Sequence, residues 1–280
     1  MISESKIEFL KEKAKALRHH IIDMIGCKDG KVGHLGGSCS IADITAALYF
    51  YKMKHDPKNP KAEDRDRFLL SKGHAALAQY AALSESGYFS KDELLIVKNY
   101  GSMLQGHPDM TKTPGIEANT GSLGQGLSIG LGMALGLKRS GSDRKAYVVM
   151  GDGELAEGQL WEAAMAAASF KADNLVGIVD ANLIQATGAV KDRMDVGDIK
   201  SKWAAFGWHV IEIDGHKMSE ICEALDKADE VKGAPVLILA HTVKGKCISF
   251  AEGQAAFHNG PLSPEQYEQA HKDVEQTVCY

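Results

Sequence analysis

Residues 146–182, AYVVMGDGELAEGQLWEAAMAAASFKADNLVGIVDAN, contain two short apolar runs with a helix-like stretch between them. The apolar runs cover residues 146–150 and 175–179, as expected of strands that are covered on both faces of a sheet. Residues 157–170 have the length and composition of a helix. A strand, a helix and a second strand predict a parallel pair joined by a right-handed crossover.

The same alternation continues along the chain. Two more apolar runs, at residues 209–213 and 235–240, predict strands, and a stretch with helical spacing precedes each of them. This alternation predicts an α/β fold, a doubly wound parallel sheet with helices on both faces, formed by residues 1–280 as a single domain. The predicted helices cover about residues 4–26, 40–54, 73–85, 126–138, 157–170, 198–206, 217–231 and 263–278.

The composition is that of an ordinary globular protein, with 25% charged and 44% hydrophobic residues among 280. The net charge of -5 gives no reason to expect nucleic acid or an anionic membrane surface as a partner. No signal-peptide core or run of about 18 apolar residues is found, so no membrane span is expected. Five scattered cysteines (Cys27, Cys39, Cys222, Cys247 and Cys279) predict reduced thiols and a cytoplasmic location.

Two polar residues, Asp152 and Asn182, each follow a predicted strand, so both are expected at the same edge of the sheet. A carboxylate and an amide oxygen suit Mg²⁺, with Ca²⁺ as an alternative, and Mg²⁺ commonly completes its octahedron with phosphate oxygens and water. Gly151 and Gly153 let the backbone approach a phosphate, and the following helix directs its positive end there. Gly-Asp-Gly alone is more often only a turn, and the metal–phosphate interpretation is favoured by the resemblance of the whole motif, from this strand to Asn182, to a known family.

Residues 151–188 resemble the cofactor-binding motif of thiamine diphosphate enzymes, and the transketolase version in particular. Further motifs occur in transketolase order between about residues 33 and 262: GHLGG, LSKGHAAL, GHPDM, NTGSLGQGL, HTVKGK and HNGPL. The resemblance therefore covers nearly the whole chain. It implies thiamine diphosphate and Mg²⁺ as cofactors and the fold of the diphosphate-binding (PP) domain.

The resemblance also implies roles for individual residues. Asp152 and Asn182 would ligate Mg²⁺ by their side chains and Ile184 by its carbonyl oxygen. Glu157 would reach a subunit interface; without the motif, a solvated glutamate in the first turn of a helix would be preferred. The implied catalytic residues are His34, His74, His107, His258 and Glu157. The implied cofactor contacts are Gly37, His74, Gly121, Ser122, Leu123, Gly153, Glu157, Asn182, Gln185, Lys244 and His258.

Four of the 11 histidines adjoin glycines, at Gly-His pairs or in His-Asn-Gly. One such pair carries little information, whereas four in transketolase order are more specific. Imidazoles can donate to sugar oxygens and move protons near neutral pH. The resemblance places His34, His74, His107 and His258 around cofactor and substrate, with His34 and His258 closest to the substrate oxygens. His216 matches no motif.

A complete transketolase is more than twice as long and continues into a pyrimidine-binding domain and a third domain. Those domains carry the glutamate that activates the cofactor and most contacts with the donor phosphate. The chain is therefore interpreted as the N-terminal subunit of a split transketolase. It would transfer a two-carbon unit from a ketose phosphate to an aldose phosphate. A C-terminal subunit is expected to supply the other domains, in an α₂β₂ assembly.

Two other classes of function stay open at this point. One is a related thiamine diphosphate enzyme, either a 2-oxoacid dehydrogenase E1 α-like subunit or a transketolase for a sulfo- or branched sugar. The other is a non-catalytic cofactor-binding subunit, which the full set of histidines disfavours. Assays of two-carbon transfer and of 2-oxoacid decarboxylation distinguish the enzymes, and reconstitution with a partner chain identifies a binding subunit.

Overall fold

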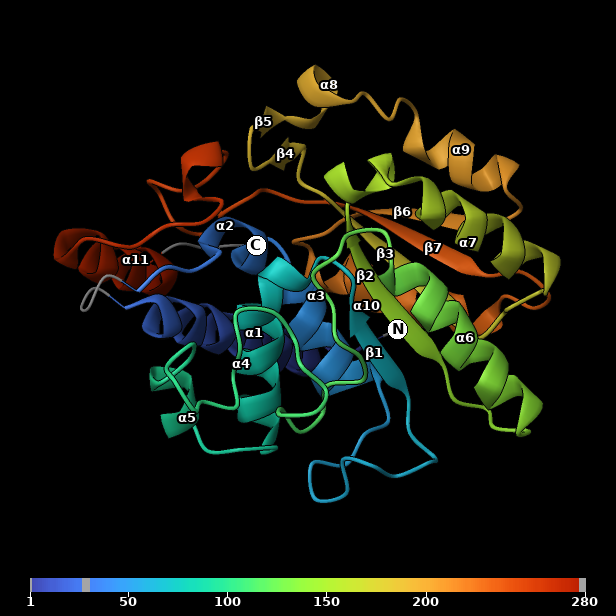
Figure 1. Ribbon diagram of the computed structural model, residues 1–280, viewed down its shortest axis with the longest axis horizontal. Coiled ribbons are helices and arrows are strands. Elements are labelled where there is room, and N and C mark those ends of the chain that lie inside the picture. The colour runs from blue at the N-terminus through green and yellow to red at the C-terminus, as the bar shows by residue number, and fades with distance from the viewer. Residues whose placement is uncertain (1, 27–30, 277–280) are drawn as a thin grey trace.

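A five-stranded parallel sheet organises the chain in the computed structural model, which describes residues 2–26 and 31–276 (Figure 1). The strand order is β1-β2-β3-β7-β6, and every neighbouring pair is parallel. The four predicted strands are confirmed, whereas β1 was not predicted because its four residues make too short an apolar run. The strands are β1 (Arg67–Leu70), β2 (Ala146–Gly151), β3 (Leu175–Ala181), β6 (His209–Asp214) and β7 (Val236–His241).

Helices cover both faces of this sheet, which confirms the doubly wound α/β fold (Figure 1). Alternate strand residues enter the two cores: Val149 and Ile178 pack into one, Val148 and Val179 into the other. The first core is covered by α1 (Glu4–Ile25), α2 (Leu35–Cys39), α3 (Ala42–Ala47), α4 (Ala76–Ser86), α10 (Met218–Glu230) and α11 (Pro264–Gln276). The second is covered by α6 (Gly126–Arg139), α7 (Gly158–Ser169) and α9 (Ile199–Ala205).

The helix boundaries follow local chemistry. Helix α1 begins where the Ser3 hydroxyl accepts a hydrogen bond from the Lys6 amide, and it ends at Gly26, whose φ of 62° suits glycine. The expected helix over 40–54 is instead α3 followed by a π-helical turn, η1 (Leu48–Lys52). The helix expected from residue 73 starts as a 3₁₀ turn, η2 (Gly73–Ala75).

Shorter elements complete the fold. They are α5 (Asp92–Leu95), α8 (Val190–Arg193), the hairpin of β4 (Ile184–Gln185) and β5 (Gly188–Ala189), and the 3₁₀ turns η3 (Gly153–Ala156) and η4 (Ala255–Phe257). Turn η3 begins at the second glycine of Gly-Asp-Gly, so a 3₁₀ turn lies between Asp152 and the predicted helix, α7.

Two expectations about the whole chain concern membrane spans and thiols. No helix among the described residues is long and apolar enough to cross a membrane. Cys39 and Cys222 are buried free thiols. Cys247 is disulfide-bonded, so the expectation of reduced thiols is wrong at that position. Cys27 and Cys279 lie outside the described residues.

Candidate functional site

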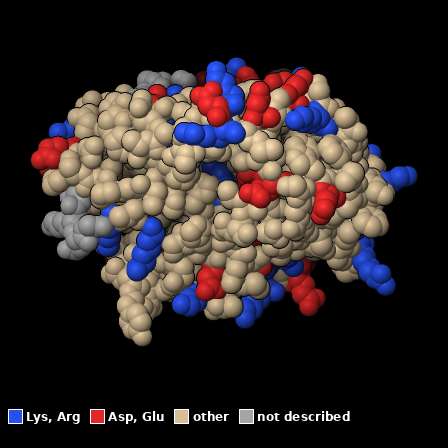
Figure 2. Space-filling model, turned by 45° about the horizontal axis from the view of Figure 1, so that its top comes forward, with Lys and Arg blue, Asp and Glu red and all other residues tan. Residues whose placement is uncertain are grey.

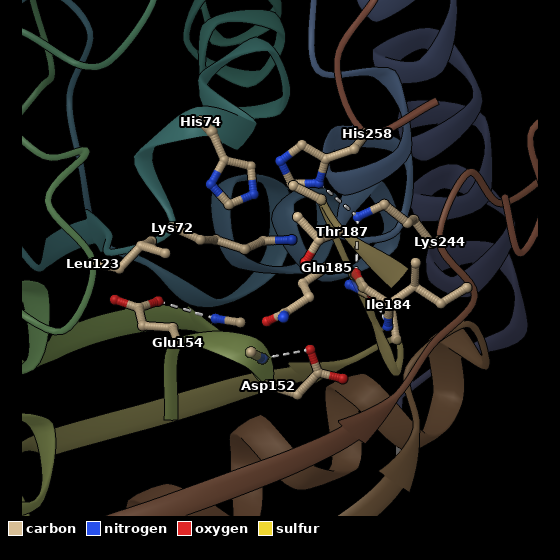
Figure 3. A pocket seen from close by; sticks show the side chains of 14 residues that line it. Lys72, His74, Leu123, Asp152, Glu154, Ile184, Gln185, Thr187, Lys244 and His258 are labelled. Carbon is tan, nitrogen blue, oxygen red and sulfur yellow. Dashed lines mark hydrogen bonds between the residues drawn. The ribbon is translucent and has the colours of Figure 1, made fainter. Parts of the chain in front are cut away.

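A cavity of about 310 Å³ opens at the carboxyl ends of β1, β2, β3 and β7. In a doubly wound sheet this is the edge where ligands bind. Figure 3 shows His74 and His258 on one side of the cavity and Asp152 on the other, with Lys72 between them. The lining residues are Lys72, His74, Leu123, Gly151, Asp152, Gly153, Glu154, Asn182, Ile184, Gln185, Ala186, Thr187, Lys244 and His258.

Asp152 stands at the end of β2 with its carboxylate tied to two backbone segments. Its Oδ1 accepts from the Gly153 amide at 2.7 Å, and its Oδ2 accepts from the Leu183 amide at 2.5 Å. The second bond brings the carboxylate beside Asn182, which directly precedes Leu183. Burial, together with the charge of Asp180, raises the pKa of Asp152 to about 6. Ionisation of Asp152 beside the Asp180 carboxylate is therefore unfavourable unless a cation lies close by.

Asn182 is oriented by a buried carboxylate that was not predicted from the sequence. Its Nδ2 donates to Asp180 Oδ2 at 2.7 Å, and its Oδ1 accepts from the Ile184 amide at 3.1 Å. Asp180 is fully buried and also accepts from Ser40 Oγ at 2.8 Å and Lys72 Nζ at 2.5 Å. Burial acts to raise the pKa of Asp180, but the Lys72 charge and the hydrogen bonds from Lys72, Thr242 and Ser40 together lower it.

The donor set fits a hard divalent ion. Asp152, Asn182 and the Ile184 carbonyl offer only oxygen, the ligand atom that Mg²⁺ and Ca²⁺ prefer. The Ile184 oxygen accepts from Lys244 Nζ at 3.0 Å, and a carbonyl has two lone pairs, so it can also face an ion. Among residues 2–26 and 31–276, no group of three or more His, Cys, Asp or Glu side chains is arranged to hold a metal.

Two buried lysines place positive charge in the same cavity. Lys72 is 1% exposed and Lys244 is 2% exposed. Burial and the neighbouring Lys72 charge lower the pKa of Lys244 to about 8. An anion in the cavity would offset the burial of the Lys244 ammonium and its repulsion by Lys72. It compensates the positive charge and supplies acceptors for the ammonium hydrogens.

The four histidines that were predicted to line the site form one cluster. The His34 ring lies 5.3 Å from His74, 5.4 Å from His258 and 6.1 Å from His107, and His74 lies 5.0 Å from His258 (centroid distances). Burial and nearby positive charges lower the pKa of His34 to about 3, of His74 to about 2 and of His258 to about 4. Burial also lowers the pKa of His107. These rings are neutral near pH 7.

Several small residues allow these side chains to approach. A Cβ on Gly37 would lie 3.4 Å from His74 Nε2, and one on Gly121, whose φ is 140°, would lie 2.9 Å from His107 Cδ2. A Cβ on Gly153 would lie 2.8 Å from Gln185 Oε1. These glycines therefore lie in close contact with the site. A side chain on Gly121 would collide with the His107 ring, whereas one on Gly153 would displace the end of the Gln185 side chain.

Six predicted site residues lie outside the lining of the cavity: His34, Gly37, His107, Gly121, Ser122 and Glu157. The two histidines and the two glycines among them adjoin rings of the histidine cluster. Ser122 is exposed beside Leu123, which does line the cavity. Glu157 is exposed at the N-terminus of α7, where a glutamate would also be favoured by the helix dipole alone.

Three residues of the site, Lys72, Glu154 and Asp180, were not predicted from the sequence. Lys72 follows β1, so recognition of that strand would have placed Lys72 at the ligand-binding edge with Asp152 and Asn182. Glu154 is buried beneath the Gly-Asp-Gly turn and accepts from the Gly124 amide at 2.8 Å and the Gly151 amide at 3.1 Å. Asp180 follows a buried apolar run and lies two residues before Asn182. This position at a strand end could have indicated that Asp180 belongs to the site.

The sequence is similar to a domain family over most of its length: residues 10–276 match the family described as transketolase, thiamine diphosphate binding domain. It is 44% identical over 274 residues to the 6-deoxy-6-sulfo-D-fructose transketolase subunit SqwG of Clostridium sp. (strain MSTE9). It is 40% identical over 273 residues to an apulose-4-phosphate transketolase subunit of Phocaeicola vulgatus. Both alignments cover 98% of this chain, and they cover 98% and 96% of those relatives.

Longer relatives match over less than half of their own length. Human transketolase is 37% identical over 274 residues, which are 97% of this chain and 43% of the human one. The crystal structure of transketolase from Campylobacter jejuni matches with a TM-score of 0.90 at 33% identity, over 98% of this chain and 44% of that one. The chain thus spans less than half the length of these single-chain transketolases.

Fold, cavity and comparisons together define a thiamine diphosphate-binding domain. More specifically, the chain belongs to the transketolase family, and the resemblance seen in its motifs is confirmed. Relatives that it matches from end to end are named as transketolase subunits.

Proposed function

We propose that this chain is the diphosphate-binding subunit of a two-chain transketolase that depends on thiamine diphosphate and Mg²⁺. The observation that carries the proposal is the convergence of Asp152, Asn182 and the Ile184 carbonyl in a cavity that also holds two buried lysines. Oxygen ligands next to buried positive charge are what a metal diphosphate requires.

The cofactor would be held from the carboxyl edge of the sheet. Asp152, Asn182 and Ile184 would bind Mg²⁺, or Ca²⁺ in its place. Gly153, Gln185 and Lys244 would contact the diphosphate, with Gly37, Gly121, Ser122 and Leu123 packed against the rest of the cofactor. When bound, thiamine diphosphate supplies a nucleophilic carbon that takes a two-carbon unit from a ketose and passes it to an aldose.

The histidines would act on the sugar. Lys244 Nζ lies 3.1 Å from His258 Nδ1, and because an ammonium only donates, Nδ1 accepts and the ring hydrogen is on Nε2. His258 can therefore donate from Nε2 to a substrate oxygen. His34, His74 and His107 surround the same space as neutral rings, which suits hydrogen bonding to hydroxyls and proton movement near neutral pH.

A partner chain would complete the active site. The chain covers 43% of human transketolase but nearly all of two proteins named as subunits. We therefore place the pyrimidine-binding and C-terminal domains on a partner, with residues 1–280 as one domain, Glu157 at the interface and an α₂β₂ assembly. Figure 2 shows a broad uncharged area between the charged side chains of one face, as is common at subunit interfaces.

The substrates would be a ketose donor and an aldose acceptor. The relatives are named for apulose 4-phosphate and for 6-deoxy-6-sulfo-D-fructose, so the named sugars carry a phosphate or a sulfonate. We propose a donor with an anionic head group of this kind, in place of a general pentose phosphate. The cytoplasmic location stays a prediction.

The test is reconstitution. The chain is mixed with a C-terminal transketolase subunit, thiamine diphosphate and Mg²⁺, and two-carbon transfer is assayed with ketose phosphates and sulfonates. Decarboxylation of 2-oxoacids is measured in parallel. Transfer that requires both chains supports the proposal. Decarboxylation alone would identify a 2-oxoacid dehydrogenase subunit, and cofactor binding without turnover on any donor would identify a binding subunit.

A further inference from the structure

A buried hydrogen-bonded relay connects the outer helices with the segment that carries Lys244. The Arg18 guanidinium, on α1, donates to both Asp43 oxygens, at 3.0 and 2.6 Å. His216, in the turn after β6, contacts Asp43 Oδ2 through Nδ1 at 2.8 Å. The amide of Val243, just after β7, donates to His216 Nε2 at 2.8 Å. Arg18 and Asp43 are 0% exposed and His216 is 7% exposed.

The partners of His216 determine its tautomer. A backbone amide can only donate, so Nε2 must accept from Val243, and the ring hydrogen is on Nδ1, facing Asp43. Burial acts to raise the pKa of Asp43, but the Arg18 charge and the hydrogen bond from His216 lower it to about 2. Asp43 is therefore an ionised acceptor that holds the imidazole in one orientation.

The residue after Val243 is Lys244, whose side chain runs through a narrow slot. A Cβ on Gly36 would lie 2.9 Å from Lys244 Cγ, and the Gly245 amide donates to the Gly36 carbonyl at 2.9 Å. Lys244 Nζ then reaches the Ile184 carbonyl at 3.0 Å and His258 Nδ1 at 3.1 Å. Because the slot is tight, a displacement of the Val243 amide would shift the ammonium.

We propose that His216 is a positioning residue for Lys244. By holding the Val243 amide against the buried Arg18–Asp43 pair, it sets the point from which the lysine enters the cavity. The consequence for ligand binding rests on the proposed function, since Lys244 is taken to contact the diphosphate. The relay itself does not depend on that function.

Two substitutions separate the two hydrogen bonds of the imidazole. The amide of His216→Asn can replace Nδ1 and keep the contact with Asp43, but it is too short to accept from Val243. The longer His216→Gln can replace Nε2 and accept from the Val243 amide while it weakens the contact with Asp43. His209→Asn is the matched control, because His209 is exposed at the opposite end of β6.

Two measurements on the full-length chain test the proposal. Hydrogen–deuterium exchange of the segment containing Val243 should be faster in His216→Asn than in wild type and nearly unchanged in His216→Gln. The affinity for thiamine diphosphate with Mg²⁺ should fall about tenfold in His216→Asn and by less than about twofold in His216→Gln and His209→Asn. A merely structural role would lower stability in both His216 variants without this contrast in affinity.

Each result bears on the proposal. Unchanged exchange in His216→Asn, or equal losses of affinity in the Asn and Gln variants, would overturn it. If His216→Asn does not fold, the cofactor affinity of His216→Gln tests the proposal. A tenfold loss of affinity in His216→Gln would contradict the relay. If wild type binds no cofactor even when mixed with a C-terminal transketolase subunit, the proposed function fails, and the exchange measurements still decide whether His216 holds the segment.

Discussion

The two sides of the cavity are built differently. On the metal side, Asp152 and Asn182 leave adjacent strands and are tied to backbone amides of neighbouring residues. On the other side, His34, His74 and His258 come from three separate segments and meet ring to ring. The first arrangement is fixed by the sheet, whereas the second depends on how loops and helices pack over it.

This difference matches the two tasks of the site. Fixed oxygen ligands suit an anchor, because a metal needs its ligands in one geometry throughout turnover. Neutral imidazoles whose pKa values are lowered by burial suit chemistry on a sugar, because they can accept or donate a hydrogen as the substrate changes. Substitutions on the metal side should therefore lower stability and cofactor binding, whereas substitutions on the histidine side should lower turnover.

The largest effect is expected from the buried pair beneath the metal side. Asp180→Asn leaves the Lys72 ammonium without its counter-charge, and removal of one member of a buried pair costs about 3–5 kcal/mol of stability. Urea unfolding of the isolated chain measures this loss. Adding Lys72→Met should recover part of it, because the unpaired charge is then gone. A loss below about 1 kcal/mol would show that the pair is not buried as described.

The next effect is on cofactor affinity. Asp152→Ala should weaken binding of thiamine diphosphate with Mg²⁺ by about 100-fold or more, because it removes a charged ligand of the proposed metal. Calorimetric titration of the chain mixed with a C-terminal transketolase subunit measures the affinity, and Asp195→Ala, at an exposed position, is the control. Binding by Asp152→Ala that equals wild type would show that the metal assignment is wrong.

The histidine side should show the opposite pattern. His258→Ala should keep the cofactor affinity within about threefold of wild type. It should lower kcat of the reconstituted enzyme by about ten- to a hundredfold, because it removes one hydrogen bond to an oxygen that becomes charged during the reaction. Steady-state kinetics with each active ketose separate kcat from KM. Unchanged kinetics on every donor would remove His258 from the reacting region.

How much of the fold was predictable follows from the strength of each local signal. The strands β2, β3, β6 and β7 are apolar runs of ordinary length, and each was predicted. β1 is four residues long, and its end had to be inferred from its pairing with β2, which no local pattern encodes. The missed strand concealed Lys72, since the strand-end argument that predicted Asp152 and Asn182 applies equally to it.

The histidine cluster shows the complementary limit. No spacing rule brings His34 next to His258, because the two are more than 200 positions apart and meet only through packing of the first helical layer; the isolated bridge between Gly33 and Gly260 is where those segments touch. The resemblance to transketolases predicted that these histidines share one site, whereas their sequence positions alone did not. His216 was passed over because its role depends on three long-range contacts and on no motif.

The smallest effect tests whether the histidines on the second side are neutral in the folded chain. Burial lowers the pKa of His34 to about 3 and of His258 to about 4, whereas an unfolded histidine titrates near 6.5. Below that pH the unfolded chain binds protons that the folded chain does not, so this part of the stability is complete above about pH 6.5 and is lost as the pH falls toward 4.

Partial exposure of both rings screens the effect, so we expect about 0.5 kcal/mol per histidine between pH 7.5 and pH 5.5. The measurement is urea unfolding of wild type and of the His34→Asn, His258→Asn double variant at both pH values. The double variant should lose less stability on acidification, because its amides do not titrate. An equal loss in both proteins would mean that the two rings ionise in the folded chain as readily as in water. The functional contrast between anchored carboxylates and neutral imidazoles would then fail at the histidine side, while the metal side would be unaffected.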